Sequence, residues 1–276
     1  MSNQKDKANF SNNMNLNKPV PFVGKGFQPN TRRWMSCFVF FIIIAILELG
    51  TTTGLISSLT LPKPSDVLGK IIELFDTGML FKHLVPSILR LIVGAFIGIS
   101  LGITIGTLIG LFSYIRSGFV PVIAAIFPIP KIALLPLFVI WFGIGEGSKY
   151  ALIALGTFTP TVVATYGAVD NVDRTLIRMG QSFGLSWFSI VYKIVLPGAM
   201  PGILSGLRIS LAIAIILLVA AEMLGAEFGI GAYILLAGSL YDLERLFAGV
   251  TILSLLGITV NVLVTFLEQK ILKWRT

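Results

Sequence analysis

The chain alternates long apolar stretches with short polar ones, and six of the apolar stretches are long enough to cross a membrane. A membrane-spanning helix needs about 20 mostly apolar residues, because the hydrocarbon core is about 30 Å thick and a helix rises about 1.5 Å per residue. Prolines crowd the third stretch and Pro160 breaks the fourth, which favours helices packed inside a bundle, where neighbours satisfy the freed carbonyl groups. The predicted spans are residues 36–56, 88–112, 119–142, 149–169, 203–224 and 246–267.

The first residues differ from the rest of the chain, because they are polar, rich in Asn and Lys, and without apolar periodicity. Residues 1–34 are therefore predicted to form a disordered tail. A cleavable signal peptide would place its apolar core much nearer Met1. Residues 35–276 form the predicted membrane domain, so the fold class is an all-α, polytopic membrane protein with about six transmembrane helices.

Orientation follows from lysine and arginine, which are enriched in cytoplasmic loops. With the N-terminus inside, thirteen of these residues lie on the cytoplasmic side and five on the other. Both termini and the polar segment near residues 174–201 are then cytoplasmic. Arg90, Lys131 and Arg208 lie near the ends of predicted spans, where their side chains can reach the interface. The thirteen are Lys5, Lys7, Lys18, Lys25, Arg32, Arg33, Arg116, Arg174, Arg178, Lys193, Lys270, Lys273 and Arg275, and the five are Lys63, Lys70, Lys82, Lys149 and Arg245.

Composition agrees with a membrane protein, since 55% of the residues are hydrophobic, 12% are charged and the mean hydropathy is +0.90. An ordinary soluble domain has about 25% charged residues. The net charge of +8 does not indicate nucleic-acid binding, because the basic residues flank apolar spans and form no stripe with interleaved aromatic residues.

Five glycines in the second predicted span recur every four residues. This spacing places them on one slowly winding ridge of a helix, where a second backbone can approach closely. The ridge predicts a centrally packed helix, with a sliding surface between helices or subunits as the alternative. The glycines are Gly94, Gly98, Gly102, Gly106 and Gly110.

Catalysis is not predicted, because the chemistry for it is sparse. His83 is the only histidine and Cys37 the only cysteine, which excludes histidine triads, disulfides and clusters of cysteine or histidine ligands for a metal. The glycine-rich stretch at residues 143–147 lacks the lysine of a phosphate-binding loop. We expect no cofactor and no metal on this chain, so ATP, if transport consumes it, is hydrolysed by another subunit.

Ionisable side chains inside spans are costly unless they are paired or face water. Glu48 and Glu222 are candidates to line a translocation path, and pairing with a neighbouring helix or a place at the interface is the alternative. Arg208 and Glu222 lie fourteen residues apart on one predicted helix, too far to pair with each other.

The polar segment from Arg174 onward has the pattern of two short amphipathic helices joined by a glycine turn. Gly184 can end the first helix with a positive φ, and Ser186 can cap the second. Trp187 and Ile194 fall at helical spacing in the second helix, and Pro197 is expected to stop it. A helical hairpin lying on the membrane surface is one reading of the pattern.

The spacing of Gly184, nine residues, and Ile194-x-Leu196-Pro197 resembles the cytoplasmic loop of ABC importer permeases, whose pattern is Glu-Ala-Ala, three residues, Gly, nine residues, Ile-x-Leu-Pro. Further stretches at residues 141–145, 171–173, 198–208 and 221–225 look like the branch that imports nitrate, sulfonates, taurine or related small molecules. The resemblance covers roughly residues 40–275.

The resemblance implies a type I ABC importer permease in a bacterial plasma (inner) membrane. It implies a homodimer with two ATPase subunits, which use ATP and Mg, docked at residues 170–201, and an extracytoplasmic substrate-binding protein. The Glu-Ala-Ala positions read Arg178-Met179-Gly180 here, which reverses the charge at the implied contact. Either the partner ATPase carries a compensating acid, or this half of the loop docks differently. The docking residues carried over are Arg178, Met179, Gly180, Gly184, Trp187, Ile194, Leu196 and Pro197.

The function expected from this sequence is therefore the permease subunit of an ATP-driven importer of a small molecule. A secondary transporter or channel driven by an ion gradient is the alternative, although we find no duplication between the two halves of the chain. A membrane scaffold or enzyme is disfavoured by the sparse chemistry.

Overall fold

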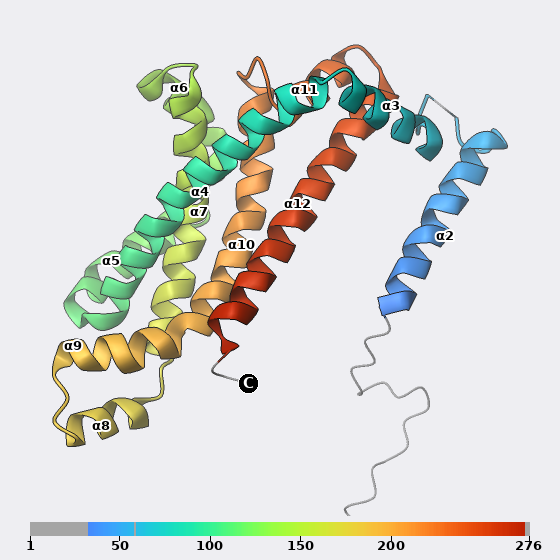
Figure 1. Ribbon diagram of the computed structural model, residues 1–276. Coiled ribbons are helices and arrows are strands. Elements are labelled where there is room, and N and C mark those ends of the chain that lie inside the picture. Colours follow the sequence, from blue (N-terminus) through green and yellow to red (C-terminus); the bar gives the residue numbers. More distant parts are fainter. Residues whose placement is uncertain (1–32, 58, 274–276) are drawn as a thin grey trace, which may run out of the picture. The chain divides into compact units, whose positions relative to one another are not determined.

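The computed structural model describes residues 33–57 and 59–273, and within these residues every regular element is helical (Figure 1). The predicted all-α fold class is thereby confirmed. The elements are α2 (Arg33–Thr52), α3 (Pro64–Asp76), α4 (Met79–Leu111), α5 (Ser113–Ile126), η1 (Lys131–Leu134), α6 (Leu135–Phe142), α7 (Glu146–Asp170), α8 (Arg174–Ser182), α9 (Trp187–Ile190), η2 (Val191–Val195), α10 (Leu196–Met223), α11 (Ile230–Ser239) and α12 (Leu243–Ile271).

The chain divides into two units between Ile46 and Leu47, and α2 contains this boundary. The predicted disordered tail lies outside the described residues up to residue 32 and stays a prediction. Arg33 and Trp34, which were assigned to the tail, belong to α2.

Within the described residues, four helical segments are long and apolar enough to cross a membrane. The helix pair formed by α5 and η1–α6 is bent by 89° and could supply a fifth span. This pair is the predicted third span, and prolines at residues 128 and 130 lie at its bend. The apolar part of α2, Cys37–Thr52, is shorter than a span. The predicted six-helix count is thus roughly met, with one broken helix and one short one.

One expected break is absent, and two helices extend beyond their predicted spans. Pro160 does not break the fourth span, because α7 continues through it from Glu146 to Asp170, and the proline is buried inside the bundle. α4 begins at Met79, nine residues before the predicted start, because polar side chains in its first turns have partners in other segments. The helix that contains the fifth predicted span starts at Trp187, because the second half of the hairpin continues into α10 without a break.

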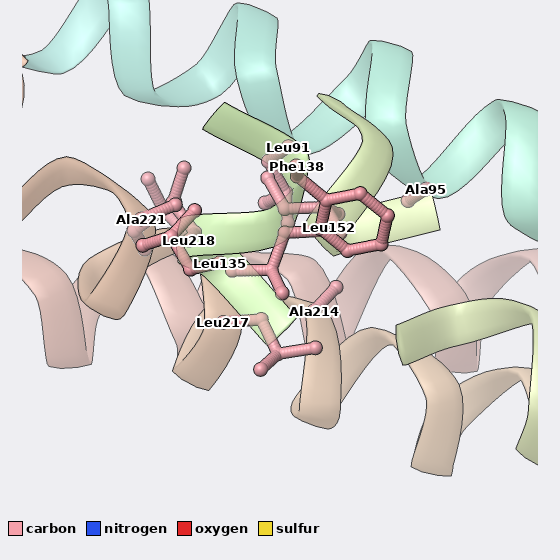
Figure 2. Packing of buried hydrophobic residues seen from close by; sticks show 11 residues of the cluster. Leu91, Ala95, Leu135, Phe138, Leu152, Ala214, Leu217, Leu218 and Ala221 are labelled. Atoms are coloured by element: carbon pink, nitrogen blue, oxygen red, sulfur yellow. The ribbon is translucent and has the colours of Figure 1, made fainter. Parts of the chain in front are cut away.

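The core is centred on α7, which lies between α4 and α10 (Figure 1). The most apolar window of α7 is 56% buried, whereas that of α12 is 17% buried. α12 is therefore peripheral in a single copy of the chain. The core cluster in Figure 2 joins residues of α4, α6, α7, α10 and α12, namely Leu91, Ala95, Leu135, Phe138, Leu152, Ile153, Ala214, Leu217, Leu218, Ala221 and Leu256.

All five glycines of the α4 ridge lie against α7. A Cβ atom on Gly98 would be 2.1 Å from both the carbonyl oxygen of Ala154 and Oγ1 of Thr157. A Cβ atom on Gly106 would be 2.8 Å from the carbonyl oxygen of Val162. The glycines therefore let the two backbones approach at distances that no larger residue would permit. Gly94, Gly102 and Gly110 face Ile153, Thr161 and Val169 in the same way.

Candidate functional site

The first part of the site is the hairpin formed by residues 173–198. Asp173 caps α8 by accepting a hydrogen bond of 2.8 Å from the backbone N–H of Thr175. This bond lowers the pKa of the Asp173 carboxyl group, because it stabilises the charged form. At the other end of α8, Gly184 has a φ of +71°, and the N–H of Leu185 donates to the carbonyl of Gly180 at 3.1 Å. This is the Schellman arrangement that ends a helix, and the glycine turn agrees with the sequence prediction.

Gly180 lies where the two halves of the hairpin touch. It is buried in α8, and a Cβ atom there would lie 2.7 Å from Cδ1 of Ile194. A small residue at this position lets α8 fold back onto the second helix. Between them is an apolar groove, hereafter the hairpin groove, lined by Leu176, Met179, Gly180, Phe183, Leu185, Lys193, Ile194, Pro197 and Gly198.

The second half of the hairpin begins where Ser186 caps α9 and accepts a hydrogen bond from the N–H of Ser189 at 3.3 Å. One π-helical turn, η2, then leads directly into α10, and the helix bends there (Figure 1). The expectation that Pro197 stops the pattern is wrong. Pro197 follows the π-helical turn directly, and the helix continues through it into α10.

Several predicted docking residues of the hairpin are accessible. Arg178 is exposed on α8, and the side chain of Met179 is 52% exposed. Trp187 is 47% exposed and stacks near Phe112, with ring centroids 5.5 Å apart. Ile194 and Leu196 are partly buried. The hairpin thus offers both charge and apolar surface.

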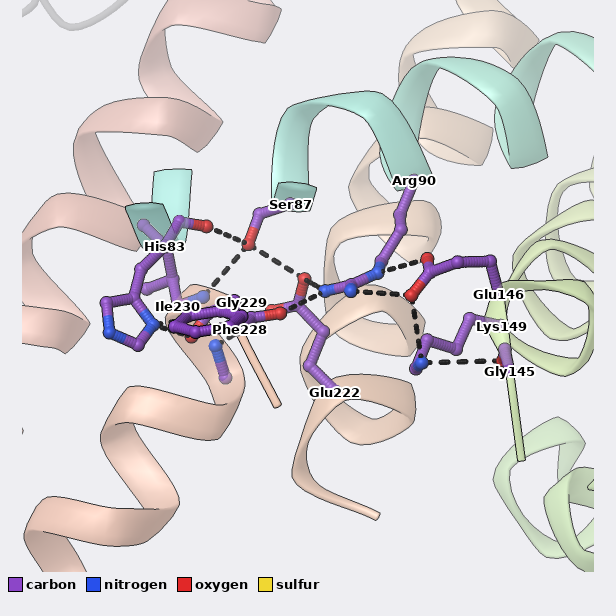
Figure 3. Close-up of polar contacts among 11 residues, drawn as sticks. His83, Ser87, Arg90, Gly145, Glu146, Lys149, Glu222, Phe228, Gly229 and Ile230 are labelled. Carbon is purple, nitrogen blue, oxygen red and sulfur yellow. Dashed lines mark hydrogen bonds and ion pairs between the residues drawn. The ribbon is translucent and has the colours of Figure 1, made fainter. Parts of the chain in front are cut away.

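The second part of the site lies at the other end of the bundle, where Arg90 joins three segments (Figure 3). Its Nε and Nη2 atoms donate to Oε2 and Oε1 of Glu146 at 2.6 and 2.7 Å. Nη1 donates to Oε1 of Glu222 at 2.8 Å and to the carbonyl of Phe228 at 2.6 Å. Lys149 Nζ lies 3.1 Å from Oε1 of Glu146 and completes an ion-pair cluster of two cations and two carboxylates.

Glu222 is the most enclosed member of the cluster, with no exposed side-chain surface. Besides Arg90, its carboxylate accepts hydrogen bonds from Oγ of Ser87 at 2.7 Å and from the N–H of Gly231 at 2.8 Å. A buried carboxylate is tolerated only with partners of this kind. Glu222 therefore follows the pairing alternative given for it in the sequence analysis, and its place in a translocation path has no support from this contact set.

Other intramembrane charges also have partners. Arg90, whose position near a span end would let it reach the interface, is 5% exposed and pairs with carboxylates of neighbouring segments. Glu48 accepts hydrogen bonds from the N–H and Oγ of Ser65 at 3.0 and 2.8 Å, so it binds the first turn of α3 near the end of α2. Arg208 pairs with Glu268 at 2.7 Å, and Lys131 donates to the carbonyl of Phe127.

Sequence reasoning missed the cluster as a unit. A signal was present, because His83, Ser87 and Arg90 have i, i+4, i+7 spacing and share one face of α4. Their partners were out of reach, since Glu222 lies 132 residues from Arg90. Among the described residues, no group of three or more His, Cys, Asp or Glu side chains could hold a metal ion.

The comparisons with known proteins agree with a membrane permease. Residues 98–273 match the family described as the inner membrane component of binding-protein-dependent transport systems. The chain belongs to this family, and it is a multi-pass permease subunit of an ABC importer. Membership implies an ATPase and a substrate-binding protein as partners. The alternative of a transporter driven by an ion gradient is not favoured.

Two similar proteins indicate the branch of the family to which the chain belongs. A putative aliphatic sulfonates transport permease of Bacillus subtilis is 36% identical over 234 residues, which cover 85% of each chain. The taurine transport system permease of Escherichia coli is 34% identical over 84% of this chain and 86% of that protein. These matches place the chain in the sulfonate and taurine branch of the family.

A solved structure shows the same fold. It is described as an inward-facing conformation of the MetNI methionine ABC transporter and aligns with a TM-score of 0.59 at 21% identity. The alignment covers 71% of this chain and 96% of that chain. At this identity the likeness concerns the fold.

Proposed function

We propose that this permease imports a small organic sulfonate such as an aliphatic sulfonate or taurine. The observation that carries the proposal is the identity of 34–36% with permeases named for these substrates, over more than four fifths of both chains. In the proposed cycle the permease is a non-catalytic homodimer in a bacterial inner membrane, and an extracytoplasmic binding protein delivers the substrate.

The hairpin is the proposed docking site of the ATPase, with one ATPase subunit on each permease copy. Two features support this role. The hairpin groove opens between α8 and the second helix, and the hairpin carries two exposed aromatic side chains, Phe183 in the groove lining at 79% and Phe188 in α9 at 78% exposed. Docking can drive transport only if the ATPase binds two conformations of the permease with different affinity.

The substrate is tested by growth and uptake. In the native organism with the gene deleted, we expect loss of growth on taurine or ethanesulfonate as the sole sulfur source and normal growth on sulfate. Reintroducing the gene should restore uptake of the labelled sulfonate. Normal growth of the deletion strain on every sulfonate, in a strain shown to have no second uptake system, would contradict the proposed substrate.

The docking role is tested at Gly184. Nothing lies within 4 Å of a Cβ atom built there, so only the positive φ opposes a side chain. A non-glycine residue in this region costs about 1–2 kcal/mol, and asparagine is among the best tolerated. We expect Gly184→Val to lower both uptake and recovery of the ATPase with the tagged permease, while Gly184→Asn keeps most of both. Equal recovery with all three chains would remove the turn from the docking site.

A further inference from the structure

One face of α4 binds the backbone of the segment that leads into α11 (Figure 3). Nδ1 of His83 lies 3.0 Å from the carbonyl oxygen and 3.2 Å from the backbone nitrogen of Gly229, and its tautomer decides which of the two it bonds. Oγ of Ser87 accepts a hydrogen bond from the N–H of Ile230 at 2.9 Å. Arg90 donates to the carbonyl of Phe228. Three successive residues of this segment are therefore bonded to side chains of one helix.

Glu222 holds the same segment from α10. Its carboxylate accepts from the N–H of Gly231, in the first turn of α11, and so satisfies a donor that has no partner inside that helix. The contact is close, because a Cβ atom on Gly229 would lie 2.5–2.7 Å from the carboxylate atoms of Glu222. Gly229 and Gly231 thus lie where α10 leaves no room for a larger side chain.

The charges of the cluster balance, and each of its charged side chains is enclosed except Glu146, which is 45% exposed. Arg90 and Lys149 offset Glu146 and Glu222, and the side chains of Arg90 and Glu222 are 6% and 0% exposed. Four of the five donors of the Arg90 guanidinium are used. Separating such a pair would leave a charge buried without a partner, which is strongly unfavourable. The geometry favours a contact that stays intact over one that opens in each transport cycle.

We propose that Arg90 is a positioning residue of the permease. Together with Glu222 it fixes residues 228–231 between α4 and α10, and through Glu146 it attaches the start of α7. The ends of α4, α7, α10 and α11 then move as one rigid body during transport. The conformational change must occur at other contacts.

The test uses single cysteines in a Cys37→Ser background, in intact cells that carry the complete transporter. Ile230 is 2% exposed, whereas Leu224, the residue directly after the end of α10, is 67% exposed. We expect a water-soluble maleimide to label Ile230→Cys more slowly than Leu224→Cys, by on the order of tenfold or more, because labelling requires local opening. The difference should be the same in energised and ATP-depleted cells. Faster labelling of Ile230→Cys during transport would overturn the proposal and make residues 228–231 a moving gate.

The ion pair itself is tested by adding Glu222→Gln to Ile230→Cys. The amide cannot accept from Arg90, Ser87 and Gly231 at once, so labelling should rise on the order of tenfold. Glu268→Gln is the matched control, because it breaks the partly exposed pair with Arg208 elsewhere in the bundle and should leave labelling unchanged.

Arg90→Lys covers the case in which Glu222→Gln fails to insert. Lysine keeps the charge but loses the fork that joins Glu146 and Glu222, so labelling should again rise, with a lower maximal uptake rate and an unchanged KM. Labelling equal to that of the parent chain in either inserted variant would show that the pair does not hold the segment.

Discussion

At Gly180 a single missing side chain allows α8 to fold back onto the second half of the hairpin. The atom that a Cβ would meet is Cδ1 of Ile194, the flexible end of a side chain that can move aside. We expect Gly180→Ala to be tolerated and Gly180→Leu to displace α8, with a cost of about 1–3 kcal/mol as for other overpacked sites.

Recovery of the ATPase with the purified permease and proteolysis of the hairpin measure this displacement. Gly167→Leu is the control, because a Cβ atom there meets nothing within 4 Å. If Gly180→Leu behaved like Gly167→Leu in both measurements, the packing of the hairpin would not depend on this glycine.

Asp173 makes the start of α8 sensitive to acid. Its folded pKa is lowered by the hydrogen bond from the Thr175 N–H, so its contribution is present above the ordinary aspartate pKa of about 3.9. That contribution is lost as the pH falls through the lower, folded pKa. Hydrogen exchange of residues 174–177 should therefore accelerate as the pH drops below about 4, relative to the intrinsic rate.

Asp173→Ala should show fast exchange at neutral pH and little further change in acid. Asp173→Asn is the control, since asparagine also caps helices but does not titrate in this range. The cap would be excluded as the cause if all three chains shared one pH profile.

At the scale of elements, the contact between α4 and α7 depends on backbone approach. A Cβ atom on Gly98 would meet the carbonyl oxygen of Ala154, which cannot move without moving α7. We expect Gly98→Ala to lower the free energy of unfolding by about 1–3 kcal/mol and to lower the Tm of the permease in mild detergent.

Gly118→Ala in α5 is the matched control, because its Cβ meets nothing within 4 Å. Alanine is favoured over glycine in a helix by about 1 kcal/mol, so this variant should be neutral or stabilising. A Gly98→Ala permease as stable as the Gly118→Ala permease would mean that the two helices can separate at little cost.

The elements that depend on a few neighbouring residues could be predicted from the sequence. The capping serine and the glycine turn of the hairpin act within a few residues, and the glycine ridge has a period that any helix must follow. The cluster around Arg90 was not predictable in this way, because its members come from positions 56 and 132 residues apart. The early start of α4 has the same cause, since its polar first turns are stabilised by partners that only the fold brings near.

Helix ends that were predicted from the positions of prolines were the least reliable. Prolines at residues 128 and 130 do accompany a bend, but Pro160 and Pro197 lie within continuous helices. In a bundle, neighbouring helices and a π-helical turn compensate for a missing N–H group. The sequence around a proline does not show whether such neighbours exist.

At the scale of the whole molecule, the distribution of basic residues predicts that the hairpin is cytoplasmic and the Arg90 cluster extracytoplasmic. Exposed positions on the two sides test this orientation. In a Cys37→Ser background, a membrane-impermeant maleimide should label Leu240→Cys in intact cells and Phe188→Cys only after permeabilisation. These side chains are 64% and 78% exposed, so in cells that express the permease without its ATPase, access differs only by side of the membrane. The reverse pattern would invert the topology.

The bend at η2 leaves α10 as a straight arm between the hairpin and Glu222. Leu196 and Glu222 are 26 residues apart, about 39 Å along a helix axis. A tilt of α10 by about 5° around the bend would carry the Glu222 end sideways by about 3 Å. That displacement exceeds the 2.7 Å between Ser87 Oγ and the Glu222 carboxylate. If α10 tilts as a rigid rod, a small rotation at the hairpin end therefore takes α4 along with α10 or breaks this hydrogen bond.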